Sequence, residues 1–227
     1  YRTLPNAVRL FDIPKKDPSD IGADMANTYQ DRELWGSFID GKFVFPKNQT
    51  TFSVMEPATD TEISKVVNAD EELVNQAVAS SRKAYENVWR HLSPRERAGI
   101  LRQVAERLKA NAPEIAELES REVGKPKRDA GRFDVTFSHT CFDYFAGLAD
   151  TLHGEILDQG PIEARIIYEP YGVVAAILPF NWPPIHFAKK SAPALAAGNT
   201  VIIKPGEQAP LSVLRMVEIA NEVLPPG

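Results

Sequence analysis

Two short polar motifs, each placed directly after an apolar run, contain the side chains best suited to chemistry. PFNWP (179–183) follows the apolar residues 172–178. KPGE (204–207) begins at Lys204, the last residue of the mainly apolar run TVIIK (200–204). Prolines hold Asn181 in a stiff loop, and a stiff side-chain amide is a preorganised donor for a developing oxyanion. From spacing alone, a strand-end asparagine between prolines is more often structural.

The second motif places a cation and a carboxylate one short turn apart. Lys204 and Glu207 on such a loop suit the hydroxyl groups of a nucleotide ribose, which can donate to a carboxylate. The chain contains neither a G-x-G-x-x-G fingerprint nor a P-loop. A nucleotide bound here would therefore be held without a glycine-rich phosphate cradle.

The elements that must position both motifs alternate between strands and helices. Residues 172–178 form a continuous apolar run, typical of a strand covered on both faces, and residues 200–204 form a second short buried strand. Helical spacing is found over 183–197, which stops at Gly198, and over 210–224. This β-α-β-α order predicts a parallel sheet with right-handed crossovers. Because ligands bind beyond the carboxyl ends of parallel strands, we expect both motifs at one edge of the sheet.

The upstream residues predict small strands followed by helices. The Asp-Gly step in WGSFIDGKFV (35–44) predicts a hairpin, and further short strands are expected at 51–54 and 62–67. Four helices are predicted after them: one capped by Asn68 with Glu71 three residues on, one with a Ser93–Glu96 capping box and Pro94 at its first position, one over 113–123 that ends at Gly124, and one over 128–152.

These elements divide the chain into three parts. Residues 1–34 show no sustained period and are expected to form an N-terminal arm. Residues 35–151 and 170–227 are predicted to build one domain around the parallel sheet. Residues 152–169 combine turn residues with a strand-like stretch, which predicts a two-stranded excursion from that domain.

Composition and charge argue against several classes of protein. The net charge of −5 argues against a nucleic-acid partner, and no apolar run is long enough to cross a bilayer. The single cysteine, Cys141, cannot form an internal disulfide, so we expect a reducing, cytoplasmic compartment. Cys141 lies among Phe137, Tyr144 and Phe145, which favours packing over reactivity. His139 would face another side of the helix, so no metal site is predicted.

The ordered motifs resemble the aldehyde dehydrogenase superfamily. The resemblance is carried by YEPYGVVAAILPFNWPPIHFAKKSAPALAAGNTVIIKPGEQAPLS (168–212) and, upstream and in the same order, by FIDGKFV, EPATDTEI, SPRERAGILRQVAERL and ESREVGKP. It covers nearly the whole chain after about residue 35. It implies an α/β fold: a Rossmann-like parallel sheet with flanking helices, which forms the cofactor-binding domain, plus a protruding β-hairpin at 152–169.

The resemblance also implies a reaction, in which a cysteine thiolate attacks an aldehyde and hydride passes to NAD(P)+ before a Glu-activated water releases the acid. Asn181 matches the family's oxyanion amide, and a weaker match places Lys190 beside it. Lys204 and Glu207 match the adenosine-ribose contacts. A carboxylate at 207 would repel a 2′-phosphate, so NAD is favoured and NADP is the alternative. The remaining matches are strand-end residues that line the cofactor, Ile177, Leu178, Pro179 and Phe180, and substrate-tunnel residues, Trp182 and His186.

The chain departs from the family pattern because it contains neither the nucleophilic cysteine nor the general-base motif. Cys141 lies upstream of Asn181 and does not match the nucleophile. We therefore expect these residues to be the N-terminal part of an enzyme, inactive alone, that oxidises a small-molecule aldehyde. A homodimer or homotetramer through 152–169 is implied. The alternatives are a non-catalytic nucleotide-binding or assembly module and, less favoured by PFNWP followed by KPGE, an acyl-phosphate reductase of similar fold.

Overall fold

The computed structural model describes residues 32–46 and 50–227, and the elements below belong to one unit, Glu33–Gly227. Most of the predicted arm at 1–34 lies outside the described residues. Among the helices that the structure describes, none combines the length and the apolar character needed to cross a membrane.

The described strands pair into four small sheets, in the orders β1-β5-β4, β2-β3, β6-β7 and β8-β9. Among these described strands, the β1–β5 and β8–β9 pairs are parallel and the others are antiparallel. The strand bounds are β1 Leu34–Trp35, β2 Ser37–Ile39, β3 Lys42–Val44, β4 Thr51–Glu56, β5 Thr61–Val67, β6 Glu155–Asp158, β7 Glu163–Ile166, β8 Val173–Ile177 and β9 Thr200–Lys204.

The helices contribute most of the buried core. Their bounds are α1 Glu71–Asn87, α2 Pro94–Ala110, α3 Ala112–Val123, α4 Lys127–Asp129, α5 Thr136–Leu148, α6 Pro183–Ala196 and α7 Leu211–Ala220, with a 3₁₀ turn at Trp89–His91 and a π-helical turn at Ala130–Val135. Large side chains that are almost fully buried come from α2, α5, α6 and α7, namely Leu101, Val104, Leu108, Phe142, Phe187, Met216 and Ile219.

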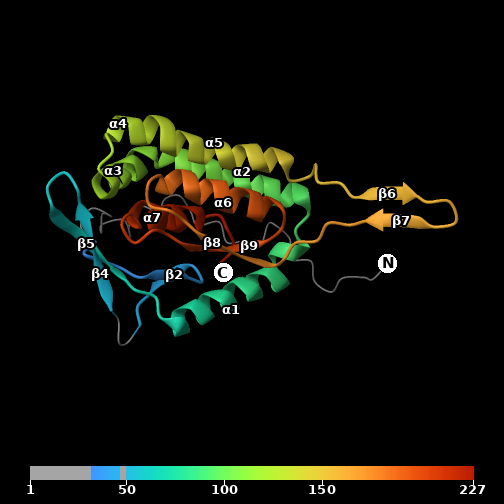
Figure 1. Cartoon of the computed structure of the whole chain (residues 1–227), viewed down its shortest axis with the longest axis horizontal. Helices are drawn as coiled ribbons and strands as arrows, with labels where there is room; N and C mark the ends of the chain where they lie inside the picture. Colours follow the sequence, from blue (N-terminus) through green and yellow to red (C-terminus); the bar gives the residue numbers. More distant parts are fainter. Residues whose placement is uncertain (1–31, 47–49) are drawn as a thin grey trace. The chain divides into compact units, whose positions relative to one another are not determined.

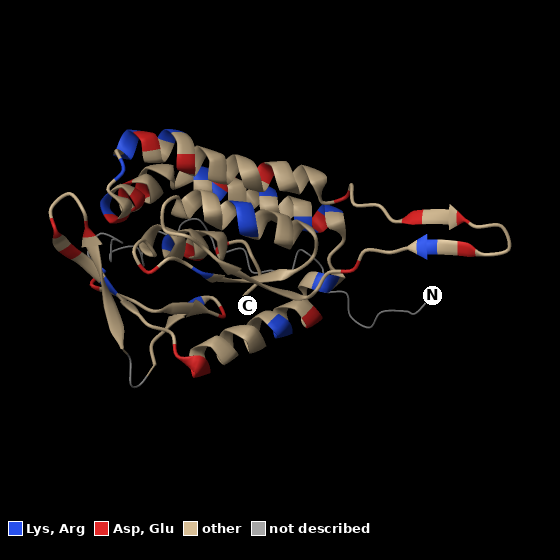
Figure 2. Cartoon of the chain, viewed as in Figure 1, with Lys and Arg blue, Asp and Glu red and all other residues tan. Residues whose placement is uncertain are grey.

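The parallel pair β8–β9 lies between helices. Helix α6 packs against this pair from one side and α1 from the other, while α2 and α5 pack together beyond α6 (Figure 1). Lys and Arg alternate with Asp and Glu along the helices (Figure 2). The observed architecture is the predicted α/β fold, a parallel sheet with flanking helices.

Local sequence signals explain several element boundaries. Asp40 and Gly41 both have positive φ, 53° and 77°, which is the geometry of a tight β2–β3 hairpin. The predicted capping box at α2 is present, since Ser93 and Glu96 bond to each other's backbone N–H. Gly124 ends α3 in the left-handed conformation at φ 81°.

Three predictions about these elements were wrong in detail. Helix α1 is capped by Asp70, whose carboxylate accepts the Leu73 N–H at 2.9 Å, because Asn68 lies two residues upstream of the N-cap position. The helix expected over 128–152 breaks at the π-helical turn and ends at Leu148. Strand β8 is not covered on both faces, because Ala175 and Ile177 are exposed on a strand that pairs with β9 along one edge among the described residues.

The excursion predicted at 152–169 is a β-hairpin. Strands β6 and β7 are antiparallel, with Glu155 opposite Ile166. Gly160 has a positive φ of 77° in the connecting turn, and Gln159 N–H donates to the Ile162 carbonyl at 2.9 Å. The hairpin extends away from the helices (Figure 1).

Candidate functional site at the carboxyl ends of β8 and β9

The parallel register of β8 and β9 brings the two polar motifs to one edge of the sheet. Ile177 is the register partner of Lys204, and the Leu178 N–H donates to the Lys204 carbonyl at 2.9 Å. The PFNWP loop therefore leaves β8 beside the point at which the KPGE loop leaves β9. This is the juxtaposition expected from the β-α-β-α order.

Close contact between the two loops fixes their spacing. A Cβ atom added to Gly206 would lie 3.0 Å from the Cβ of Phe180 and 3.1 Å from its Cα and backbone nitrogen. Any other residue at this position would require the backbone of the first loop to shift by a few tenths of an ångström. Gly206 was not predicted as a site residue, and its position in KPGE is the only sequence signal for it.

The Lys204–Glu207 pair lies at the surface of this edge. Lys204 Nζ lies 2.5 Å from Glu207 Oε1, and the side chains are 54% and 61% exposed. Lys204 Nζ also donates to the Pro205 carbonyl at 3.2 Å. The hydrogen bond from Lys204 lowers the pKa of Glu207, assisted by a backbone hydrogen bond and by the lysine charge. The Glu207 carboxylate is thus held in its ionised, acceptor-only form.

The first loop presents exposed side chains beside this pair. Asn181 is exposed immediately before the start of α6, where Pro183 and Pro184 are buried. Of the predicted strand-end residues, Ile177, Pro179 and Phe180 are exposed and the Leu178 side chain is buried in the core. A ligand at this edge could reach the side chains of the exposed residues.

Trp182 and His186 form a stacked pair at the beginning of α6. Their ring centroids lie 6.4 Å apart with an interplanar angle of 29°. Burial lowers the pKa of His186, and the charges of Lys189 and Lys190 lower it further, so the imidazole is neutral at pH 7. Its Nε2 atom is buried without a hydrogen-bond partner among the described residues. Lys190 itself is exposed.

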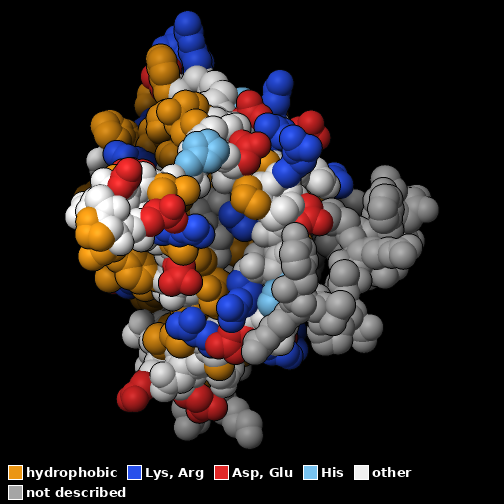
Figure 3. Space-filling view, turned by 90° about the vertical axis from the view of Figure 1, so that its right-hand side faces the viewer, with side chains coloured by type: hydrophobic (Ala, Val, Ile, Leu, Met, Phe, Trp, Pro, Cys, Tyr) orange, Lys and Arg blue, Asp and Glu red, His pale blue; other side chains and the backbone are white. Residues whose placement is uncertain are grey.

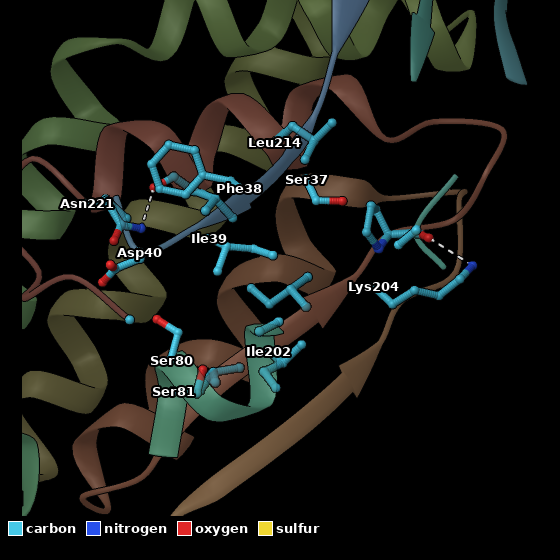
Figure 4. Close-up of a pocket in the computed structure, with 18 of the residues that line it drawn as sticks. Ser37, Phe38, Ile39, Asp40, Ser80, Ser81, Ile202, Lys204, Leu214 and Asn221 are labelled. Carbon is cyan, nitrogen blue, oxygen red and sulfur yellow. Dashed lines mark hydrogen bonds between the residues drawn. The ribbon is translucent and has the colours of Figure 1, made fainter. Parts of the chain in front are cut away.

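A cavity of about 420 Å³ extends from the β9 end of the site (Figure 4). It is lined by β9, α1, α7 and the β2–β3 hairpin, and its wall is mainly apolar with Lys204 and Glu207 at one end. The polar side chains that are labelled in Figure 4 are Ser37, Asp40, Ser80, Ser81, Lys204 and Asn221. The cavity is thus continuous with the surface that carries the Lys204–Glu207 pair.

The part of the chain that the structure describes offers no alternative metal or thiol chemistry. Among these residues, no group of three or more His, Cys, Asp or Glu side chains is placed to hold a metal ion. Cys141 is 8% exposed on α5, and burial raises the pKa of its thiol. A raised thiol pKa lowers the thiolate fraction, which agrees with the predicted packing role.

Two buried carboxylate sites were not identified from the sequence. Glu122, near the end of α3, accepts hydrogen bonds from the start of α7. Lys125 bonds to both Glu119 and Asp134, which are almost fully buried. Both sites depend on how separate elements pack together, and the spacing of apolar residues within one element does not predict such contacts.

A β-α-β-α unit with a polar site at the carboxyl ends of its parallel strands belongs to the nucleotide-binding class of α/β structures. The comparison with protein families is more specific. The model of the aldehyde dehydrogenase family matches residues 43–227, and the chain belongs to this family.

Relatives and solved structures agree with this assignment. The aldehyde dehydrogenase citD of Monascus ruber is 47% identical over 174 residues, which cover 77% of this chain and 34% of that protein. PnpE, solved in complex with nicotinamide adenine dinucleotide, has 38% identity and a TM-score of 0.81, over 84% of this chain and 39% of that one. A variant of an aldehyde dehydrogenase from Bacillus cereus has 32% identity and a TM-score of 0.83, over 87% and 40%. The chain spans about a third of the length of the curated relative.

Proposed function

We propose that this chain provides the oxyanion amide and the nucleotide-ribose contacts of an NAD(P)-dependent aldehyde dehydrogenase. The observation that carries the proposal is the register of β8 and β9, in which the Leu178 N–H donates to the Lys204 carbonyl. This register places the loop of Asn181 and the loop of Glu207 at one edge, so that one extended ligand can contact both loops.

The exposed residues of this edge fit the groups of a dinucleotide. Glu207 is ionised and exposed, so it can accept hydrogen bonds from both hydroxyls of a ribose, and Lys204 can donate to one of them. Ile177 and Phe180 are exposed apolar surface beside them. NAD+, when bound, supplies the hydride acceptor. A 2′-phosphate would meet the Glu207 carboxylate, so NAD is favoured over NADP.

Asn181 has the chemistry required at the reacting carbonyl. Its amide can donate to the oxygen of an aldehyde as negative charge develops there, and the prolines that flank its motif limit its reorganisation. Trp182 and His186, stacked next to it, would contact the rest of the substrate. A neutral His186 adds no positive charge to that wall.

Nucleotide titration of the chain tests the cofactor contacts. Wild-type protein is expected to bind NAD+ more tightly than NADP+, measured by calorimetry. Glu207→Gln should weaken NAD+ binding about five- to tenfold, because the amide loses the charge of the carboxylate and one of its two acceptor oxygens at an exposed position. Glu62→Gln, which changes the exposed glutamate of the Lys65–Glu62 pair on β5, is the matched control. Equal losses in both variants, or a preference for NADP+, would contradict the assignment.

The chain alone is expected to bind the nucleotide without oxidising aldehydes. Its one cysteine, Cys141, is buried and has a raised thiol pKa, so no reactive thiolate faces the site. Aldehyde-dependent formation of NADH by purified chain would refute this expectation. A chain that binds NAD+ and also lacks activity would agree with both this proposal and a non-catalytic nucleotide-binding module.

We also propose that the β6–β7 hairpin mediates self-association. All four residues of β6 are exposed, and Ile156, Ile162 and Ile167 are 66–76% exposed. Seen from the hairpin end, apolar side chains gather on one side of the face (Figure 3). An exposed strand edge with apolar side chains favours strand addition by a second chain.

A single charged substitution in the hairpin tests this role. Ile156→Lys should shift the chain toward monomer in sedimentation velocity at tens of micromolar, because it places a charge in the contact. Val78→Lys, at an exposed apolar position of α1, is the control and should leave the distribution unchanged. A wild-type chain that sediments only as monomer would argue against the hairpin interface.

A further inference from the structure

The N-terminus of α7 is capped by a carboxylate from α3. The Leu211 N–H donates to Glu122 Oε2 at 2.6 Å, and the Ser212 N–H donates to Oε1 at 2.9 Å. The Ser212 hydroxyl also donates to Oε1. Pro210, at the N-cap position, offers no side-chain acceptor. Glu122, 3% exposed, therefore satisfies backbone donors that the start of a helix leaves without intrahelical partners.

This cap lies at the far end of the loop that carries Glu207. The loop leaves β9 at Lys204, whose carbonyl is bonded to Leu178, and Gly206 then packs against Phe180. Beyond Glu207, the N–H of the buried Ala209 donates to the Gly206 carbonyl at 3.2 Å, and the bonds from the start of α7 to Glu122 follow. Glu207 thus lies in a short turn that the Gly206–Ala209 bond closes, and the α7 cap holds the end of the loop that follows this turn.

We propose that Glu122 is a positioning residue for nucleotide binding, which holds the end of the β9–α7 loop so that the Glu207 carboxylate faces the ribose. The inference rests on the proposed function. Glu122 does not touch the site and acts through the start of α7. Its loss would let α7 begin later or shift, and Glu207, four residues before Leu211, would lose its fixed direction.

The neighbouring charges do not share this role. Arg121 pairs with Glu56 at 3.4 Å, and Arg215 on α7 pairs with Glu114 and Glu218. Among the residues that the structure describes, Glu122 bonds to Leu211 and Ser212 and to no arginine or lysine. The Glu122 carboxylate therefore accepts hydrogen bonds from the first turn of α7, where the helix dipole favours a negative charge.

Glu114 provides a matched control because it joins the same two helices away from the loop. Its carboxylate contacts Arg215, with Nε lying 2.5 Å from Oε1. Glu114→Gln and Glu122→Gln each replace one carboxyl group of the α3–α7 contact by an amide, the first at a partly buried position and the second at a buried one. Only Glu122→Gln also places amide hydrogens against the N–H groups of Leu211 and Ser212. A difference between the two variants therefore reports on the loop.

The test combines hydrogen exchange with nucleotide affinity in the whole chain. In Glu122→Gln, peptides covering 205–212 should exchange faster, NAD+ should bind about five- to tenfold more weakly, as for loss of a helix cap, and the NAD+ to NADP+ affinity ratio should fall. Glu114→Gln should lower the melting temperature without these changes. Glu122→Asp, which keeps the carboxylate, should restore part of the affinity.

Two results would show that Glu122 does not position the β9–α7 loop. One is unchanged hydrogen exchange and unchanged NAD+ affinity in Glu122→Gln. The other is an equal loss of NAD+ affinity in Glu122→Gln and Glu114→Gln. If Glu122→Gln does not fold, Ser212→Ala, which removes one donor only, gives the same comparison. If wild-type protein does not bind NAD+, the proposed function fails, whereas exchange over 205–212 still shows whether Glu122 fixes the loop.

Discussion

The edge of the β8–β9 sheet and the contact of α3 with its neighbours both contain carboxylates, but in opposite environments. At the edge, Glu207 is exposed and Lys204 lowers its pKa. In the α3 contacts, burial raises the pKa of Glu122 to about 7 and that of Glu119 to about 9. The difference teaches that the carboxylate of Glu207 at the sheet edge is open to solvent, whereas the buried carboxyls bond to other elements, Glu122 to the start of α7 and Glu119 to Lys125.

The largest expected effect is that of a substitution at the sheet edge, which should lower activity without lowering stability. In a hybrid enzyme that carries this chain in place of the matching segment of its Monascus ruber relative, Asn181→Ala should lower kcat by about 10²- to 10³-fold, as for loss of an oxyanion donor. The exposed position of Asn181 predicts an unchanged melting temperature. Steady-state kinetics and thermal denaturation measure both. A kcat within threefold of wild type would remove Asn181 from the reacting centre.

A substitution in the buried contacts should have the converse effect. Lys125→Met leaves the carboxyls of Glu119 and Asp134 without the cation that bonds to both. Breaking a buried pair in this way should lower the free energy of unfolding by about 3 kcal/mol. Lys127→Met, which removes an exposed ion pair with Glu117, is the control and should cost less than about 1 kcal/mol. Similar losses in the two variants, measured in urea, would show that the buried cluster is not structural.

The sequence predicted the sheet edge better than the buried contacts, and for physical reasons. Asp40-Gly41, Ser93 with Glu96, and Gly124 act within one turn, so their types alone identify the boundaries that the structure shows. The ends of β8 and β9 follow from apolar runs and a crossover helix. By contrast, the partners of Glu122 lie 89 and 90 residues away. Such a contact has no local periodicity and depends on how α3 packs on α7.

The exposure of β8 could not be predicted for a related reason. An apolar run such as 173–177 indicates that a strand can be covered, but not which segment covers it. The π-helical turn at Ala130–Val135 was also missed, because helical spacing continues through it. Asn181, Lys204 and Glu207 were predicted from their motifs and from the family resemblance, and the register of β8 and β9 brings their two loops to one edge of the sheet.

The smallest effect is a pH dependence with opposite signs in the two regions. A lowered pKa at Glu207 gives stability that is lost only as pH falls below about 4.5, so it adds no slope at higher pH. A raised pKa at Glu119 means that the folded state holds a proton which the unfolded state releases. Stability should therefore fall as pH rises from about 4.5 toward 9.

The difference between wild type and Glu119→Gln from pH 7 to 9 isolates Glu119, because the other titrating groups are the same in both proteins. Glu122, with a pKa of about 7, still loses its proton at the start of this interval, whereas His139 and His186 have lowered pKa values and are neutral there. The wild-type melting temperature should fall over this interval by a few degrees, on the order of 2–4 °C for each kcal/mol lost. Glu119→Gln should show a flatter profile. A wild-type profile that rises with pH, or parallel profiles, would contradict the protonated form of Glu119.

A crystal structure of the chain grown with NAD+ tests the central claim most directly. We predict that the adenosine ribose hydroxyls lie within hydrogen-bonding distance of the Glu207 carboxylate and that the nicotinamide end extends toward Asn181. A nucleotide seated elsewhere, with Lys204 and Glu207 still paired to each other and no contact to either loop, would contradict the account.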